Sequence, residues 1–372
     1  MPCRDTAITL ASRILSALWP AGHPRPLPPD PRILVLKPCC LGDVLMATAV
    51  VEALRRHWPT ASIDFAVGRW SQPAVEHHPH LRRLIDCGRV GEGAYSWREW
   101  LELARRIRAG QYDLCLVLDR SPAMALLPAL AGVPWRVGLD SAGRGIALTR
   151  RVPVAGLMHE VDLYLACVRA LGIPTEGARP TFYPTPAARE RVRGMIPAGR
   201  SVAVIHPAGG QNPGMALSAK RWPAPRYAEI ARRLAQERQA SVIIVGGPGD
   251  RELAEEVRHL AGELEHVHNM AGELSFDELG ALLERAAVFV GNDTGAMHLA
   301  AAVGTPTVAV FGPSDPRRYG PYGAGHRAVW KPPECAPCFD RGRWNESCQR
   351  FRCIEAVSVE DVWQAISQVW PA

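Results

Sequence analysis

Three segments of the chain place an apolar run directly before residues that could bind or activate a ligand. In the first, the apolar run 33–37 leads into Lys37-Pro-Cys-Cys-Leu-Gly-Asp43, at the start of a helix predicted over 43–57. A carboxylate at a helix N-terminus can stabilise the helix by about 0.3–1 kcal/mol. It can equally act as a general base that takes a proton from a hydroxyl group. The residues alone leave both interpretations of Asp43 open.

The second segment joins a glycine-rich turn to a lysine. The run 201–207 continues into Gly209-Gly210, and Lys220 precedes a helix predicted over 224–237. Backbone N–H groups of such a turn and a lysine ammonium are donors that suit a diphosphate. The alternative is a surface loop with a solvated charge. Lysine is rare here, because only Lys37, Lys220 and Lys331 are lysines among 43 basic residues; this favours a specific role for Lys220.

The third segment is Gly291-Asn-Asp-Thr-Gly-Ala-Met-His298, between an apolar run at 287–293 and a short helix predicted over 295–302. Asp293 can accept hydrogen bonds from sugar hydroxyls. Thr294 and the N–H group of Gly295 face an anion from a helix N-terminus. Helix capping alone is the other interpretation of Asp293 and Thr294, and His298 could either pack in the core or contact ligand.

Four cysteines lie close together near the C-terminus, namely Cys335, Cys338, Cys348 and Cys353. Four thiolates can close a tetrahedral zinc site, which here would be structural. The spacing lacks a second Cys-x-x-Cys, so free thiols or a redox-dependent disulfide remain alternatives.

Composition limits the class of protein. Hydrophobic residues make up 47% and charged residues 22% of 372 residues, as in globular proteins, and the net charge of +6 is too dispersed for a nucleic-acid-binding face. The remaining cysteines lie singly or beside apolar runs, which favours reduced thiols and a cytoplasmic location. No signal peptide or membrane-spanning run is evident. An amphipathic helix predicted over 6–19 could pack on the protein or lie on a membrane surface.

Apolar runs alternate with amphipathic ones in two series. The first has predicted strands at 33–37, 62–67 and 113–119 with helices at 43–57 and 96–109; the second has strands at 201–207, 241–247, 287–293 and 305–312 with helices at 224–237, 250–261, 275–286 and 295–302. Apolar strands separated by helices predict parallel sheets covered on both faces. We therefore expect two doubly wound α/β domains, whose ligands bind at the carboxyl ends of the strands, in a cleft that the two domains share.

Domain boundaries follow from composition. Residues 1–31 form an N-terminal segment and a connector with six prolines among residues 20–31, and 32–180 form the first domain. A proline-rich linker is expected at 181–200. Residues 201–356 form the second domain, with the cysteine-bearing loop 335–353, and a helix follows over 357–372.

As a set, these motifs resemble those of glycosyltransferase family 9, the ADP-heptose:lipopolysaccharide heptosyltransferases, from about Pro31 to Val369. The resemblance rests on LGDV, HPxGG with a later lysine segment, and VGNDTGAMHLA followed by TPTVAVFGPSDP. It implies the GT-B fold, Asp43 as the base, Lys220 on the donor diphosphate, and Asp293, Thr294 and Gly295 on sugar and phosphate. A looser match of the loop around Asp250 implies contact with the nucleoside.

The reaction so implied is an inverting transfer of a sugar, with ADP-heptose as the expected donor and a lipopolysaccharide core or other glycan or glycolipid as acceptor. No metal would be needed, because Lys220 and a helix N-terminus meet the charge on the leaving group. The enzyme would work in the cytoplasm, where it could associate with the inner face of the membrane. Alternatives are a transferase for another nucleotide-diphosphate sugar, an epimerase on the same fold, which needs no acceptor, and a non-catalytic sensor, which needs no Asp43.

Overall fold

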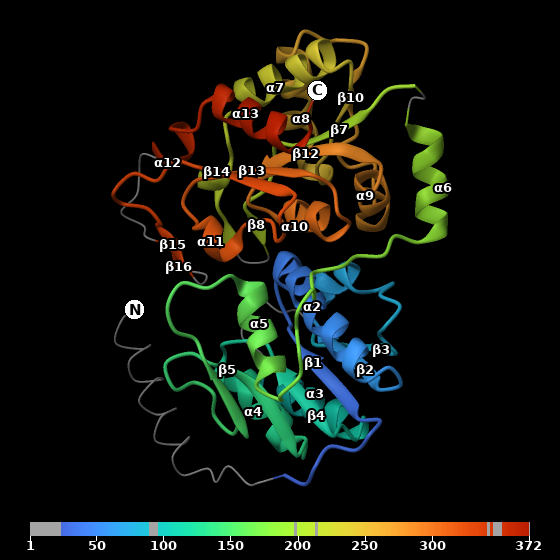
Figure 1. The fold of residues 1–372 in the computed structure, drawn as a ribbon, viewed down its shortest axis with the longest axis vertical. Helices are drawn as coiled ribbons and strands as arrows, with labels where there is room; N and C mark the ends of the chain where they lie inside the picture. Colours follow the sequence, from blue (N-terminus) through green and yellow to red (C-terminus); the bar gives the residue numbers. More distant parts are fainter. Residues whose placement is uncertain are drawn as a thin grey trace. The chain divides into compact units, whose positions relative to one another are not determined.

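The structure is a computed structural model that describes residues 24–88, 96–196, 199–212, 215–340, 343–344 and 352–371 (Figure 1). The helix expected over 6–19 and the candidate zinc ligand Cys348 lie outside these residues. The chain divides into two compact units, Met1–Thr181 and Phe182–Ala372.

The first unit alternates strands and helices along the chain. Its elements are β1 (Arg32–Leu36), α2 (Leu41–His57), β2 (Ser62–Val67), the 3-10 helix η1 (Arg69–Ala74), β3 (Arg83–Asp86), α3 (Trp97–Ala109), β4 (Leu114–Val117), α4 (Pro122–Leu130), β5 (Trp135–Asp140), β6 (Arg150–Pro153) and α5 (Glu160–Arg169).

The six strands that the structure describes in this unit form one parallel sheet in the order β3-β2-β1-β4-β5-β6. The side chains of β1 alternate between its two faces. Leu34 and Leu36 pack in a core with Leu103 and Ile107 of α3. The buried side chain of Ile33 lies on the opposite face, which α2 covers, and α2 packs against α5. Helices therefore cover both faces, which is why the central strands are apolar throughout.

The second unit repeats this pattern. Its elements are α6 (Pro186–Met195), β7 (Val202–His206), a hairpin of β8 (Gln211–Asn212) and β9 (Met215–Ala216), η2 (Ser218–Lys220), α7 (Ala224–Glu237), β10 (Ser241–Ile244), η3 (Pro248–Asp250), α8 (Arg251–Leu260), β11 (Val267–Asn269), α9 (Phe276–Leu283), β12 (Ala286–Asn292), α10 (Gly295–Ala302), β13 (Thr307–Phe311), α11 (Pro316–Tyr319), β14 (His326–Trp330), a hairpin of β15 (Phe339–Asp340) and β16 (Arg343–Trp344), α12 (Arg352–Glu355) and α13 (Val359–Val369).

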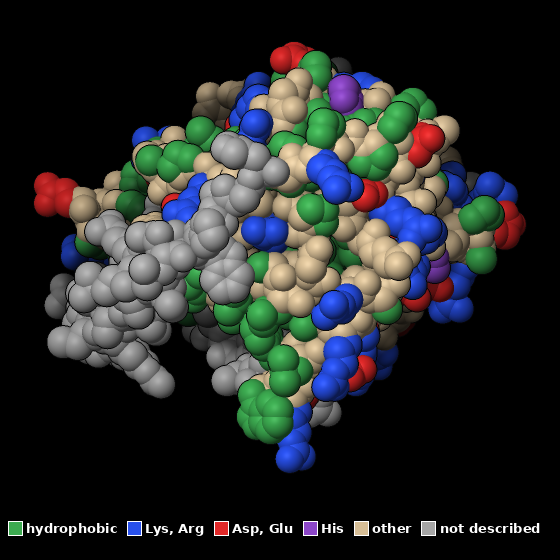
Figure 2. Space-filling view, turned by 90° about the horizontal axis from the view of Figure 1, so that it is seen from below, with side chains coloured by type: hydrophobic (Ala, Val, Ile, Leu, Met, Phe, Trp, Pro, Cys, Tyr) green, Lys and Arg blue, Asp and Glu red, His purple; other side chains and the backbone are tan. Residues whose placement is uncertain are grey.

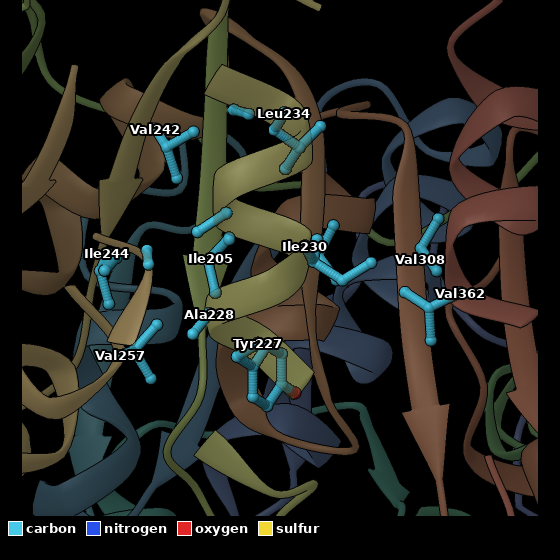
Figure 3. Packing of buried hydrophobic residues seen from close by; sticks show 14 of the residues in the cluster. Ile205, Tyr227, Ala228, Ile230, Leu234, Val242, Ile244, Val257, Val308 and Val362 are labelled. Atoms are coloured by element: carbon cyan, nitrogen blue, oxygen red, sulfur yellow. The ribbon is translucent and has the colours of Figure 1, made fainter. Parts of the chain in front are cut away.

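The second parallel sheet has the order β11-β10-β7-β12-β13-β14. Its main core lies between the sheet and helices α7, α8 and α13 (Figure 3). Ile205 of β7 lies in this core with Ile230 and Leu234 of α7, and Val362 of α13 packs beside Val308 of β13. The apolar stripe of α7 thus fixes the strand that carries the glycine-rich turn.

The segment expected as a linker, 181–200, contains helix α6. Thr185 caps this helix, because its hydroxyl accepts a hydrogen bond from the Ala188 N–H group. The same residue binds the carboxylate of Asp277 on α9, and α6 packs against α9. The helix was not predicted because four of its ten residues are charged and only Ala188 and Val192 are buried, so its apolar pattern is weak.

Charge is dispersed on the face drawn in Figure 2, where Lys and Arg side chains lie among apolar and uncharged groups. Over the described part of the chain, no helix has both the length and the apolar character that crossing a bilayer requires.

Candidate functional site

In both sheets the strands are added first to one side of the unit's first strand and then to its other side, so the strand order reverses next to that first strand. The reversal falls between β1 and β4 in the first unit and between β7 and β12 in the second. Doubly wound sheets bind ligands at the carboxyl ends of the strands at such a switch point. The segments after these four strands are those that carry the candidate residues, so each unit has its own candidate site.

In the first unit, three charged side chains meet at the switch point. The Lys37 ammonium, just after β1, lies 3.2 Å from Oδ2 of Asp43 and 3.9 Å from Oδ2 of Asp119, which follows β4. Burial disfavours the charged lysine, but the carboxylates of Asp43 and Asp119 outweigh burial and raise the pKa of Lys37 above its ordinary value. Lys37 is therefore a buried cation that holds the candidate base in place.

The helix-cap interpretation of Asp43 fits the structure poorly. The N-cap residue of α2 is Cys40, whose side chain makes no capping hydrogen bond, and Asp43 lies within the first turn. Its carboxylate pairs with Lys37 and is 30% exposed, so part of it is open to a ligand. The helix dipole still stabilises this charge, but the side chain does not serve as the cap.

In the second unit, the structure brings Lys220 and Asp293 together. The Lys220 ammonium donates a hydrogen bond of 2.6 Å to Oδ2 of Asp293, and the Ser314 hydroxyl, after β13, donates to the same oxygen. Asp293 is 7% exposed. Burial raises the pKa of such a carboxyl group, but Lys220 and Ser314 outweigh it and lower the pKa of Asp293. A buried ion pair thus links the turn before α7 to the end of β12.

Helix α10 begins beside this pair. Thr294 is its N-cap, and the threonine hydroxyl accepts a hydrogen bond from the Met297 N–H group. The first N–H groups of a helix have no partner within it, so those of Gly295 and Ala296 can bind an anion. His298 is buried within α10, and its charge, when present, would favour the ionised form of Asp293.

Gly209 and Gly210 form a turn that other residues cannot form without strain. Both have positive φ angles, +121° and +74°. A Cβ atom on Gly209 would lie 2.1 Å from Cγ2 of Thr294, and one on Gly210 would lie 2.1 Å from the Leu217 carbonyl oxygen. The glycines let the backbone of this turn approach the start of α10 closely.

The buried side chain of Asn292 connects the loops of the site. Its oxygen accepts hydrogen bonds from the backbone N–H group of Trp222 and from the Tyr227 hydroxyl, and its amide donates to the carbonyl oxygens of Pro207 and Ala208. One buried amide therefore ties the glycine turn, the lysine segment and β12 together.

Asp250 and His206 lie at the same carboxyl edge. The Asp250 carboxylate accepts a hydrogen bond from the Gly247 N–H group, and the residue is the N-cap position of α8. His206 ends β7, and its Nδ1 atom is buried without a hydrogen-bond partner. Burial lowers the pKa of His206 to about 4, so the imidazole is neutral at pH 7.

Three of the four candidate zinc ligands fall on described residues. Cys335 is exposed, whereas Cys338 and Cys353 are buried. The Cys338 thiol lies 3.2 Å from the Cys335 carbonyl oxygen. Within the described residues, no three His, Cys, Asp or Glu side chains are grouped so that they could hold a metal ion. The described cysteines thus do not by themselves form a site, and zinc binding stays a prediction.

The motifs did not identify four residues that complete these sites: Lys37, Asp119, Ser314 and Asn292. Lys37 could have been found from the scarcity of lysine. Asp119 and Ser314 each follow an apolar strand, at the edge where the other candidates lie. Asn292 had no distinguishing signal, because a buried amide and a turn residue look alike in sequence.

Two parallel sheets with this strand order and candidate sites at both switch points are the architecture of the GT-B fold. The chain matches the sequence profile of glycosyltransferase family 9 (heptosyltransferase) over residues 100–348 and belongs to that family. This confirms the fold class and the enzyme class that the motifs predicted.

Individual relatives carry names that agree with this family assignment. Lipopolysaccharide heptosyltransferase 2 of Escherichia coli (strain K12) is 31% identical over 293 residues, 77% of this chain and 84% of that protein. Lipooligosaccharide heptosyltransferase 2 of Haemophilus influenzae is 30% identical over 296 residues, with the same coverage of 77% and 84%. The structure of E. coli ADP-heptose LPS heptosyltransferase II is 24% identical with a TM-score of 0.71, over 91% of this chain and 98% of that one. A family 9 glycosyltransferase from Veillonella parvula has a TM-score of 0.74 at 22% identity, over 94% and 99%.

Proposed function

We propose that this glycosyltransferase moves a heptose from ADP-heptose to an acceptor hydroxyl of the lipopolysaccharide core, with inversion and without a catalytic metal. The observation that carries the proposal is the buried Lys220–Asp293 pair beside the glycine turn and the N-terminus of α10. Relatives named for lipopolysaccharide heptosyl transfer, and a solved relative bound to ADP, support the choice of donor and acceptor.

The second unit is the donor half in this proposal. The Gly209-Gly210 turn and the first N–H groups of α10 would bind the diphosphate. Lys220 gives one of its three N–H donors to Asp293 and keeps two for phosphate oxygens. Asp293 has one oxygen held by Lys220 and Ser314, and its other oxygen could accept a hydrogen bond from a sugar hydroxyl. The pair therefore positions the donor as well as balancing its charge.

The first unit supplies the base. Asp43 would take the proton of the acceptor hydroxyl as that oxygen attacks the anomeric carbon of the sugar. The bond from this carbon to the phosphate oxygen then breaks, and ADP leaves with the electron pair. Attack and departure on opposite faces invert the anomeric centre. Lys37 would keep the carboxylate oriented toward the acceptor, since the two are 3.2 Å apart. A base of this kind contributes about 100- to 10,000-fold in rate.

Charge on the leaving group would be met by Lys220 and the N–H groups of α10, which is the electrostatic role that a metal ion fills in other transferases. The helix predicted over 6–19, if it lies on the membrane, would bring the enzyme to a lipid-anchored acceptor. That membrane contact and the cytoplasmic location stay predictions.

The test is a donor and acceptor screen with the purified protein. ADP-heptose, ADP-glucose, GDP-mannose and UDP-glucose are each incubated with and without a heptose-deficient lipopolysaccharide core. We expect transfer from ADP-heptose only when the core is present, and an anomeric configuration opposite to that of the donor. Transfer from the GDP- or UDP-sugar instead, retention of configuration, or conversion of the sugar without an acceptor would each contradict the proposal.

A further inference from the structure

Two neighbouring cysteines lie in the loop that positions the candidate base. Cys39 and Cys40 lie between β1 and α2, and both residues are partly exposed. The two residues are adjacent in the chain, and their side chains act on each other: Cys40 lowers the pKa of Cys39, and Cys39 raises the pKa of Cys40. Cys40 occupies the N-cap of α2 without capping it. Ser, Thr, Asp or Asn at an N-cap typically stabilises a helix by about 1 kcal/mol, so capping does not explain a cysteine here.

The surroundings of Cys39 favour reactivity. The Cys40 side chain and the nearby Lys37 ammonium lower the pKa of Cys39 below its ordinary value, although burial opposes this. The thiols of Cys115 and Cys167 are fully buried, and burial raises their pKa. Within the first unit's described residues, Cys39 thus combines partial exposure with a lowered pKa, whereas the Cys39 side chain and burial raise the pKa of its neighbour Cys40.

We propose that Cys39 and Cys40 form a vicinal dithiol site that captures one trivalent arsenical, or a thiophilic metalloid centre of the same class, through both sulfur atoms. Soft thiolate ligands select soft centres of this kind. With an aryl arsenoxide, both thiols give up their protons, the arsenic-bound oxygen leaves as water and two sulfur–arsenic bonds form. Arsenic stays trivalent, so the step needs no oxidant or reductant.

The position of the site predicts what capture does to the enzyme. Cys40 is the N-cap and Asp43 is three residues further on, and side chains at these two helix positions lie next to each other. The charge of Asp43 acts on both thiols, which agrees with this proximity. A captured arsenical would therefore lie against the carboxylate. Loss of transfer on capture rests on the proposed role of Asp43, whereas capture itself does not.

Capture is tested with phenylarsine oxide and intact-protein and peptide mass spectrometry. Tryptic peptide 33–55 contains Cys39 and Cys40 as its only cysteines, and peptide 328–341 contains Cys335 and Cys338. We expect one phenylarsenic group on peptide 33–55 that persists in excess 2-mercaptoethanol and is removed by 2,3-dimercaptopropanol. Bonding through two linked thiols resists a monothiol because the second bond forms intramolecularly.

Two serine variants and one control decide whether both sulfurs are needed. Cys39→Ser and Cys40→Ser should each abolish the monothiol-resistant adduct on peptide 33–55, whereas Cys335→Ser should leave it intact. Persistence of that adduct in either variant, or an adduct in wild type on peptide 328–341 alone, would overturn the proposal. The wild-type mapping holds even if a variant fails to fold.

The activity arm compares each protein with its own untreated sample. Phenylarsine oxide should reduce wild-type transfer at least about tenfold, with recovery on addition of 2,3-dimercaptopropanol, and should change transfer by Cys39→Ser less than twofold. An adduct on peptide 33–55 without loss of activity would refute the blocking of Asp43 but not the capture. Absence of transfer before any treatment would count against the proposed function alone.

Discussion

The Lys220 ammonium lies 2.6 Å from the Asp293 carboxylate, although the two residues are 73 positions apart in the chain. In the sequence they belong to separate motifs, one suited to phosphate and the other to sugar hydroxyls. Their contact makes them one unit, because removal of either residue leaves a buried charge without its partner. Effects of substitutions at the two positions should therefore not be additive.

Substitution of Lys220 tests the donor site. Lys220→Met should raise the Kd for ADP by about 10- to 150-fold, since a charge-assisted hydrogen bond to phosphate is worth about 1.5–3 kcal/mol. Isothermal titration calorimetry measures this. Lys331→Met is the matched control, because Lys331 is half exposed and pairs with Asp361 on the surface. Equal affinities of both variants and wild type would return Lys220 to a structural role.

Substitution of Asp43 tests the base. Asp43→Asn removes the ability to take a proton but keeps the size of the side chain, so kcat should fall at least about 100-fold while the Kd for ADP stays unchanged. Steady-state kinetics and calorimetry measure the two quantities. Asp162→Asn, in the first turn of α5, changes the same charge at a similar helix position and should leave kcat near wild type. A near-normal kcat in Asp43→Asn would disprove the mechanism.

Loss of the Asn292 side chain should destabilise the second unit strongly. In Asn292→Ala the Trp222 N–H group and the Tyr227 hydroxyl lose their buried acceptor. Each unsatisfied group costs about 1–3 kcal/mol, so the free energy of unfolding should fall by about 3 kcal/mol or more. Urea denaturation followed by tryptophan fluorescence checks this. Asn269→Ala, at a partly exposed position, should cost less than about 1.5 kcal/mol; equal losses would mean that the network contributes little.

The buried His206 should make stability depend on pH. Its pKa is about 4 in the folded protein and near the ordinary 6.5 when unfolded. Between these values the unfolded state binds more protons, so stability rises with pH from about 4 to about 6.5 and is complete above that. The contribution of this residue is at most about 3 kcal/mol.

The measurement is the free energy of unfolding at intervals across that pH window. His206→Gln should flatten the profile relative to wild type, because glutamine does not titrate. His57→Gln, at an exposed position at the end of α2, is the control and should keep the wild-type slope. Parallel profiles for wild type and His206→Gln would show that this imidazole is accessible to protons when folded.

The effect of a chelator on turnover and on stability distinguishes a catalytic metal ion from a structural one. Turnover should be unchanged after brief treatment with EDTA, because the proposed site meets leaving-group charge with Lys220 and backbone N–H groups. Immediate loss that Mg²⁺ restores would contradict the mechanism. If the cysteine-bearing loop 335–353 binds zinc, a slower loss should accompany release of zinc and a lower melting temperature, and metal analysis by mass spectrometry would detect it.

Much of the fold could be predicted from sequence because the central strands are apolar and their helices are long. The predicted strand 62–67 and helix 224–237 coincide with β2 and α7, and the predicted helix 43–57 begins two residues after the start of α2. The edges of the sheets were missed. Strand β14 begins with the polar residues His326 and Arg327 and has no buried residue, and β3 has a charged residue at each end, so neither forms an apolar run.

The candidate sites were predictable to the level of motifs but not of pairings. The motifs located Asp43, Lys220 and Asp293, because each follows a strand in a doubly wound pattern. No pattern within a motif could show that Lys37 would contact Asp119, since that contact depends on β1 and β4 being neighbours in the sheet. Strand order is a property of the tertiary fold, and only the structure supplies it.

The central position of β1 has a consequence for synthesis of the protein. The Arg32 N–H group at the start of β1 binds the carboxylate of Asp113, which lies 81 residues later and directly precedes β4. At about 5–20 residues per second, the ribosome needs roughly 4–16 seconds to make the intervening chain. During that time one edge of an apolar strand has no partner to pair with. Until β4 emerges, the nascent first unit therefore exposes an unpaired strand edge of the kind that favours aggregation.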